Sequence, residues 1–250
     1  MYKNNIKNLN FKNCNTLKSG FRHEFKYYIN FFEYEILRRK LKCCLEQDEN
    51  SDEFGNYHIR SLYFDDIHNT ALYEKQAGVL TRKKYRIRIY NLSDGVIKLE
   101  KKSRTGQFIS KVSVSITKKQ YYKILHKDVG FMKVSDNALL KELYFDMVSS
   151  LYEPIVIVDY VREAYVWQPN NVRITFDKNL STGLNSVDIF DDVGTIKVIE
   201  ETQLILEIKY DSFLPDFIRS ILQINSSQKY AISKYVICRK YSKLNPWEDN

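Results

Sequence analysis

The sequence contains little glycine, proline and cysteine, and it has no long apolar run. Eight Gly and four Pro in 250 residues exclude a collagen-like or linker-rich chain. The four cysteines, Cys14, Cys43, Cys44 and Cys238, form no CxxC pair, so neither a zinc site nor a disulfide framework is indicated. No segment approaches the roughly 18 apolar residues of a membrane helix, and no signal peptide is recognisable. We therefore expect reduced thiols and a cytoplasmic protein.

Aromatic side chains and positive charge are abundant instead. The 19 Tyr and 14 Phe residues favour strands, and a chain of this length can bury the core of one β-rich domain. The net charge of +8 fits an anionic partner such as nucleic acid, a membrane surface or phosphate compounds, although a solvated basic surface explains it equally well. The positions of the charges along the strands decide between these interpretations.

The order of the expected elements predicts an α+β fold. Residues 1–18 are expected to form a loose N-terminal leader, and residues 19–245 a single domain. The expected strands are Phe21–Ile29, His58–Phe64, Lys83–Asn91, Val96–Lys102, Ser110–Ile116, Ile155–Trp167, Val172–Asp177, Thr195–Ile199 and Leu204–Tyr210. The expected helices are Phe31–Leu45, Leu72–Ala77, Lys118–His126, Asp136–Leu151 with Asp136 as N-cap, 215–224 and Lys229–Tyr241.

Within these strands the charged residues share one face. Arg82, Lys84, Arg86 and Arg88 alternate with Tyr and Ile, and residues two apart in a strand point to the same side. In any single strand, this alternation is also what an ordinary antiparallel sheet with one solvent-exposed face would show. Solvent faces normally mix both signs, however, whereas Arg and Lys dominate strand after strand here. If the sheet curls into a barrel with this face inside, the result is a basic tunnel for a polyanion.

The residue types on this face suit phosphate chemistry. Arg grips phosphate oxygens with two parallel hydrogen bonds, and Lys supplies mobile point charges. A Glu among them is explained by Mn²⁺ or Mg²⁺, because a carboxylate-bound metal bridges to phosphates. Glu207 is the leading candidate metal ligand, and Glu24 and Glu100 are weaker ones. Each carboxylate could instead be a counter-ion of neighbouring Lys or Arg residues.

A series of short motifs resembles the VTC domain, the polyphosphate polymerase module of the vacuolar transporter chaperone complex, within the triphosphate tunnel (CYTH-like) superfamily. The motifs run in order along nearly the whole chain. They are Arg22–Tyr27, Ile59–Asp65, Arg82–Tyr90, Leu99–Lys102, Tyr160–Tyr165, Val172–Asp177, Leu206–Tyr210 and Ser233–Tyr235. The resemblance implies an antiparallel β-barrel tunnel with helices packed outside.

The resemblance also implies a set of site residues. The catalytic residues would be Lys26, Arg86, Arg88, Arg162, Arg173 and Lys209. Further substrate contacts would come from Arg60, Lys102, Lys111, Lys229, Ser233 and Lys234. The metal ligands would be Glu207, Glu24 and Glu100. Alternation along the strand favours Lys102 over Lys101 as the inward residue. Because Ala231 stands two residues before Ser233, either Lys229 takes the place of a further family Lys or that contact is absent.

The implied reaction is transfer of the γ-phosphoryl group of ATP to a growing inorganic polyphosphate chain. Hydrolysis of tripolyphosphate or nucleoside triphosphates is the main rival, but Arg22 stands where hydrolytic relatives carry the first Glu of an ExExK-type strand, which favours phosphate binding over water activation. A non-catalytic polyphosphate-binding module is a second rival. Nucleic acid is not expected as a partner, because no recognised motif is present and a closed tunnel would exclude a duplex. A separate membrane subunit remains compatible with the sequence.

Overall fold

The computed structural model describes residues 23–106, 108–183, 186–191, 194–223 and 231–244. The expected leader, residues 1–18, lies outside these ranges. The described strands are β1 (His23–Asn30), β2 (Glu46–Gln47), β3 (Asn56–Asp65), β4 (Thr81–Tyr90), β5 (Ser93–Thr105), β6 (Phe108–Ser115), β7 (Glu153–Trp167), β8 (Val172–Thr182), β9 (Ile196–Lys197) and β10 (Gln203–Tyr210). The described helices are α1 (Phe31–Cys44), α2 (Thr70–Gln76), α3 (Lys118–Leu125), α4 (Gly130–Lys133), α5 (Ala138–Ser149), α6 (Asp216–Ile221), α7 (Lys234–Leu244) and the 3₁₀ turn η1 (Pro169–Asn171).

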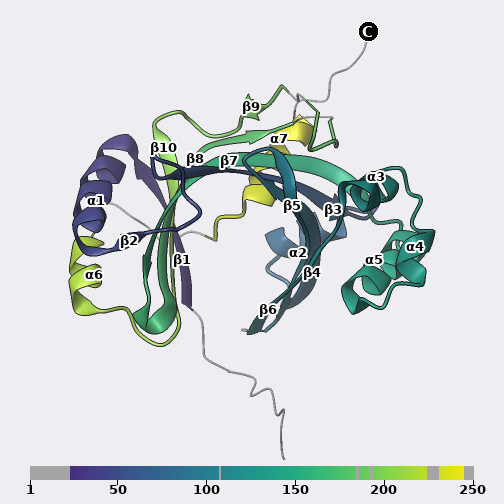
Figure 1. The fold of residues 1–250 in the computed structure, drawn as a ribbon, viewed down its shortest axis with the longest axis horizontal. Coiled ribbons are helices and arrows are strands. Elements are labelled where there is room, and N and C mark those ends of the chain that lie inside the picture. The colour runs from purple at the N-terminus through teal and green to yellow at the C-terminus, as the bar shows by residue number, and fades with distance from the viewer. Residues whose placement is uncertain (1–22, 107, 184–185, 192–193, 224–230, 245–250) are drawn as a thin grey trace, which may run out of the picture.

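These strands form one antiparallel sheet in the order β1-β10-β8-β7-β3-β4-β5-β6, with β2 added to β7 and β9 added to β8. The sheet curls into an arch, and β1 and β6 end its two walls (Figure 1). The expected antiparallel sheet with outer helices is confirmed, but closure into a barrel is not observed among the described strands. Closure would need backbone pairing of the two edge strands, whereas the walls meet through side chains, with Lys102 Nζ 3.2 Å from Glu24 Oε2.

Helix α1 starts where its sequence supplies a capping box. The Asn30 side chain accepts a hydrogen bond from the Glu33 backbone N–H, and the Glu33 carboxylate accepts one from the Asn30 N–H, both at 2.9 Å. These two bonds satisfy N–H groups that the first helical turn leaves unpaired. Tyr34, Leu37 and Leu41 then face the outer side of the left wall, where they join an apolar cluster with β8 and β10.

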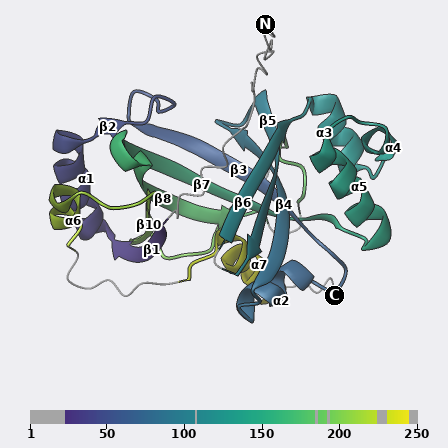
Figure 2. The same ribbon diagram turned by 90° about the horizontal axis from the view of Figure 1, so that it is seen from below.

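Helices α3, α4 and α5 cover the outside of the opposite wall (Figure 2). Thr117 and Gln120 form a second capping box at the start of α3. Helix α5 begins after Asn137, whose side chain accepts hydrogen bonds from the N–H groups of Leu139 and Leu140. The expectation that Asp136 is the N-cap is therefore wrong by one residue, because both residue types cap well and the sequence alone does not choose between neighbours.

The third apolar cluster lies inside the arch, where α7 and α2 pack against β7 and β3 (Figure 1). Tyr235 in α7 donates a hydrogen bond to the buried carboxylate of Asp65, and its ring lies 5.2 Å from that of Tyr63. The described part of the last helix starts at Lys234 rather than at Lys229, which lies outside the described residues. No helix in the described ranges is both long enough and apolar enough to cross a bilayer.

Candidate functional site

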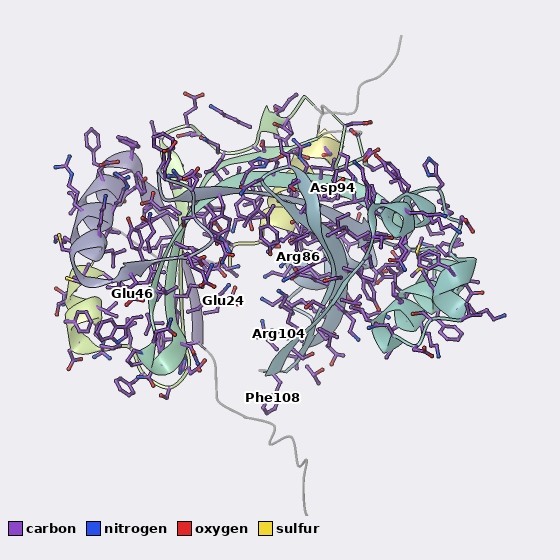
Figure 3. All side chains as sticks on the ribbon, viewed as in Figure 1. Glu24, Glu46, Arg86, Asp94, Arg104 and Phe108 are labelled. Carbon is purple, nitrogen blue, oxygen red and sulfur yellow. The ribbon has the colours of Figure 1, made fainter. Side chains whose placement is uncertain are left out.

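Strand alternation places the charged side chains inside the arch and the apolar side chains under the outer helices. In β4 the side chains of Tyr85, Ile87 and Ile89 are fully buried in the outer apolar cluster, whereas Arg86 and Arg88 line the interior. Figure 3 shows Arg86 and Arg104 on one wall and Glu24 on the other, facing the same space. The sequence pattern of basic against apolar faces is thus realised with the basic face inward.

The interior encloses a cavity of about 1310 Å³, hereafter the basic cavity. Fifteen Lys or Arg residues but only two carboxylates, Glu24 and Glu207, are among the described residues that line it, although one of the fifteen, Lys83, directs its ammonium to the outer face, where it pairs with Asp146. The basic residues are Lys26, Lys75, Arg82, Lys83, Lys84, Arg86, Arg88, Lys98, Lys102, Arg104, Lys111, Arg162, Arg173, Lys209 and Lys234. Such an excess of one sign concentrates a strong positive potential, because the cavity walls have a low dielectric constant.

Glu207 of β10 lies at the centre of the densest group of charges. Its carboxylate is 2.7 Å from Lys209 Nζ and 3.8 Å from Lys26 Nζ, and β1 and β10 place Lys26 directly opposite it. Arg162 of β7 adds a contact at 3.6 Å and Lys234 of α7 one at 4.0 Å. Four cations from four different elements therefore surround one carboxylate whose side chain is only 5% exposed.

Asp177 of β8 pairs with two of these four cations, Arg162 and Lys234. Its two carboxylate oxygens accept hydrogen bonds from Arg162 Nε at 2.6 Å and Nη2 at 2.8 Å, and it also pairs with Lys234. The paired bonds fix the plane of the guanidinium, so Arg162 and Lys234 are held in place before any ligand binds. Asp177 was not among the expected site residues, although the alternation of its strand places it on the same face as Arg173.

The charges of this group shift several pKa values. Burial alone would raise the pKa of Glu207, but Lys26, Lys209, Lys234 and Arg162 outweigh it and hold that pKa well below its usual range. Burial lowers the pKa of Lys209 to about 8, against the opposing influence of Glu207 and Glu24. Glu207 is thus ionised at neutral pH.

A second ion-pair group occupies the opposite wall. Arg86 pairs with Glu100 at 2.6 Å from both Nε and Nη2, and Lys111 of β6 pairs with the same carboxylate. Burial would raise the pKa of Glu100, but Arg86, Arg88 and Lys111 lower it to about 2. Arg88 lies near enough to Glu100 to lower its pKa, but among the described residues it forms no direct ion pair and donates instead to Ser61 Oγ at 3.0 Å and to the Tyr160 hydroxyl at 3.3 Å. Its charge is therefore available to an anion in the cavity.

Tyr63 and Lys84 form a titratable pair that the sequence analysis missed. Burial raises the pKa of Tyr63, but Arg86, Lys84 and Arg88 outweigh it and bring the value to about 7. Burial lowers the pKa of Lys84 to about 8, and the charges of Lys102, Lys26 and Arg86 lower it further while Tyr63 opposes them. Lys84 was visible on the basic face of the strand, but nothing in the sequence placed Tyr63 beside it.

Most of the expected site residues line the basic cavity, and the three exceptions are Glu100, Lys229 and Arg60. Lys26, Arg86, Arg88, Arg162, Arg173, Lys209, Lys102, Lys111, Ser233, Lys234, Glu24 and Glu207 all do so. Glu100 lies on the inner face but is covered by Arg86 and Lys111. Lys229 lies outside the described residues. Lys101 pairs with Glu142 outside the wall, as alternation indicated.

The orientation of Arg60 differs from the one expected from the sequence. In β3 the residues Tyr57, Ile59 and Tyr63 line the cavity, so Arg60 points to the outer face. There it donates to Asp159 at 2.6 Å and to the carbonyl oxygens of Ile189 and Asp191. The expectation that Arg60 contacts the substrate is wrong for this conformation, because strand parity turns the side chain away.

The two inward carboxylates suit a divalent cation that is shared with phosphates. Glu24 and Glu207 lie close together, because Lys26 Nζ is 3.0 Å from the first carboxylate and 3.8 Å from the second. Burial and the adjacent Glu207 would raise the pKa of Glu24, but the charges of Lys26 and Lys102 outweigh them and lower it. Among the described residues, no group of three or more His, Cys, Asp or Glu side chains is arranged to hold a metal by itself. Mg²⁺ commonly takes one or two protein carboxylates and completes its coordination with phosphate oxygens and water. Glu24 and Glu207 fit that arrangement.

The sequence profile of the VTC domain matches residues 21–243 of the chain. The chain belongs to the VTC-domain family. The resemblance noted from the short motifs is therefore confirmed over nearly their whole span.

Comparison with solved structures gives distant matches. The PH1819 protein from Pyrococcus horikoshii OT3 is 13% identical with a TM-score of 0.47, covering 88% of this chain and 99% of its own. A proposed adenylate cyclase from Bacillus halodurans is 12% identical with a TM-score of 0.45, covering 82% and 86%. These values are too low to support an argument about activity. No curated protein matches the chain in sequence.

Proposed function

We propose that this protein is a polyphosphate polymerase that transfers the γ-phosphoryl group of ATP to the end of an inorganic polyphosphate chain. The observation that carries the proposal is the charge of the basic cavity, where fourteen Lys or Arg side chains with inward charge, Lys83 being turned outward, but only two carboxylates are among the described lining residues. A ligand that neutralises this excess must itself be a dense polyanion. The family assignment agrees with a phosphate chain as that ligand.

The reaction needs positioning and charge neutralisation more than acid–base chemistry. An ionised terminal oxygen of the chain attacks the γ-phosphorus, the bond from that phosphorus to the β-phosphate oxygen breaks, and ADP leaves. No proton moves, so no general base is required. Arg162, held by Asp177, and the adjacent Lys26, Lys209 and Lys234 would bind the reacting phosphates in line. A bound Mg²⁺ or Mn²⁺ held by Glu207 and Glu24 would supply further neutralisation of the developing charge.

Hydrolysis is less well supported by the same cavity. A phosphohydrolase of this kind needs several carboxylates to hold metal and orient water. Here only Glu24 and Glu207 are among the described residues that line the space, and Glu207 is surrounded by four cations. Two carboxylates can hold one metal that is shared with phosphates, but they leave no further described carboxylate on the lining to orient an attacking water, whereas the surrounding cations favour phosphate binding.

The test is to incubate the purified protein with ATP, Mn²⁺ and a short polyphosphate primer and to resolve the products on a gel. Longer chains together with ADP are expected, and both should be lost in Arg88→Ala, which removes an inward cation that forms no direct ion pair with any described residue. Arg39→Ala is the matched control, because Arg39 lies on the outer surface of α1 with its side chain 83% exposed. Release of inorganic phosphate without chain growth would contradict the proposal.

A further inference from the structure

A second group of cations lies at one end of the basic cavity, apart from the residues assigned above. It consists of Lys75 from α2, Arg82 from β4 and Arg104 from β5, all half-buried and all lining the cavity. Arg82 and Arg104 are register partners in neighbouring strands. Their side chains start about 5 Å apart on the same face, and like charges in that position repel.

The protein does not neutralise this group with its own carboxylates. Arg104 Nε donates to the carbonyl oxygen of Gly106 at 2.8 Å, Arg82 donates to that of Val79, and Lys75 to that of Ala231 at 3.4 Å. Within the described ranges none of the three takes part in an ion pair, although Glu74 weakly offsets the repulsion at Arg82. Burial lowers the pKa of Lys75, and the charges of Arg82, Lys26 and Arg104 lower it further. The uncompensated repulsion persists unless a ligand removes it.

The group also marks a chemical difference between the two ends of the cavity. The pairing of β4 with β5 sets opposite each other Arg88 and Lys98, Arg86 and Glu100, Lys84 and Lys102, and finally Arg82 and Arg104. Arg82 lies four residues from Arg86 along the strand, which is roughly 13 Å. Figure 3 shows Arg104 further along the wall than Arg86, toward Phe108 and away from Asp94.

The other end of this series carries aromatic and amide groups. Tyr57 and Tyr90 line the cavity there with ring centroids 6.4 Å apart, and Asn91 lies beside them. Planar aromatic rings and amides suit a nucleoside, whereas the Arg82 end offers cations and backbone carbonyls. The end with Arg82 and Arg104 is therefore suited to a ligand that is phosphate throughout.

We propose that Lys75, Arg82 and Arg104 form an outer subsite that binds the part of the polyphosphate chain lying beyond the phosphates held at Lys26, Arg162 and Lys209. This inference rests on the proposed function. The two facing guanidinium groups grip successive phosphates of the chain. The outer subsite thereby retains long chains without taking part in phosphoryl transfer, and it separates the growing chain from the nucleotide end.

The test is direct binding, measured by calorimetry without nucleotide, of tripolyphosphate and of a long polyphosphate of defined length. The double variant R82Q/R104Q is compared with R39Q/R219Q, which removes two charges from exposed surface ion pairs outside the cavity. For R82Q/R104Q, we expect the affinity for the long chain to fall roughly tenfold or more, with a smaller salt dependence, while tripolyphosphate binding changes less than about twofold. R39Q/R219Q should leave both affinities close to wild type.

The outcomes separate this inference from the proposed function. If wild-type protein binds both ligands and R82Q/R104Q binds the long chain as the wild type does, the outer subsite does not exist. An equal loss for tripolyphosphate and the long chain also overturns it, because the two arginines would then belong to the central site. Wild-type protein that binds neither ligand contradicts the proposed function, and the outer subsite with it.

Discussion

Replacing Glu207 by Gln is the most informative single perturbation, because it removes a charge while keeping the size of the side chain. Glu207 is ionised and lies within 4.0 Å of Lys26, Lys209, Arg162 and Lys234. Without its charge, these four cations repel one another, and Asp177 and Glu24 are the carboxylates that remain in contact with them among the described residues. The free protein should therefore become less stable.

The magnitude follows from the burial of the group. Removing one partner of a buried ion pair destabilises a protein by about 3–5 kcal/mol. The side chains of Lys26 and Lys209 remain 22% and 25% exposed, so water screens part of the loss and we expect about 3 kcal/mol. For a chain of this size the melting temperature should fall by roughly 6–12 °C.

The assay is thermal unfolding in phosphate-free buffer, with and without tripolyphosphate. The added anion should restore most of the lost stability, and metal-free tripolyphosphate should bind Glu207→Gln more tightly than wild type because a repelling carboxylate is gone. Glu201→Gln is the control, since Glu201 is 78% exposed in a surface pair with Lys197 and should change stability by less than about 0.5 kcal/mol. An unchanged or raised melting temperature for Glu207→Gln in the absence of anion would refute the reasoning.

Three further predictions concern the cavity and the outer helix. Binding of tripolyphosphate should take up protons, because a polyanion favours the protonated forms of Tyr63 and Lys84, whose free-protein pKa values are about 7 and about 8. The affinity for tripolyphosphate should then fall as the pH rises through this range. Calorimetry in buffers of different ionisation enthalpy measures the proton uptake, and the absence of any uptake would show that Tyr63 and Lys84 do not face the ligand. Asp177→Asn should weaken tripolyphosphate binding, because it releases the two hydrogen bonds that hold the Arg162 guanidinium in place. Wild-type affinity in a direct titration would contradict this expectation. Asn30→Ala should lower the unfolding free energy of the chain by about 1 kcal/mol in urea titrations through loss of the capping box, and an unchanged midpoint would show that the cap contributes nothing.

Local patterns in the sequence were sufficient to predict the main features of the fold. The period of two in β4, β8 and β10 separated basic from apolar faces, and this separation decided which side chains enter the cavity. The Asn30 and Thr117 helix starts likewise follow from short-range hydrogen bonding. Such features depend on neighbours in the chain, so one sequence is sufficient to predict them.

Features that depend on tertiary geometry were missed or misplaced. Arg60 belongs to a recognised motif, but β3 is buried on both faces, so the pattern alone does not tell which face turns to the cavity, and Arg60 points outward to Asp159. The role of Asp177 follows from the approach of β7 and α7 to the same point of β8. Closure of the sheet depends on the summed twist of eight strands, which no local pattern specifies. The short strand β2 and the helix α4 were missed because segments of two and four residues carry almost no periodic signal.

The most direct test of the central claim is ³¹P NMR of a reaction containing the protein, ATP, a divalent metal and a short polyphosphate primer. We expect growth of the resonance of internal chain phosphates together with that of ADP, with little free phosphate, and loss of this growth in Arg88→Ala but not in Arg39→Ala. Accumulation of inorganic phosphate at the expense of ATP or primer, without new internal phosphates, would contradict the polymerase assignment.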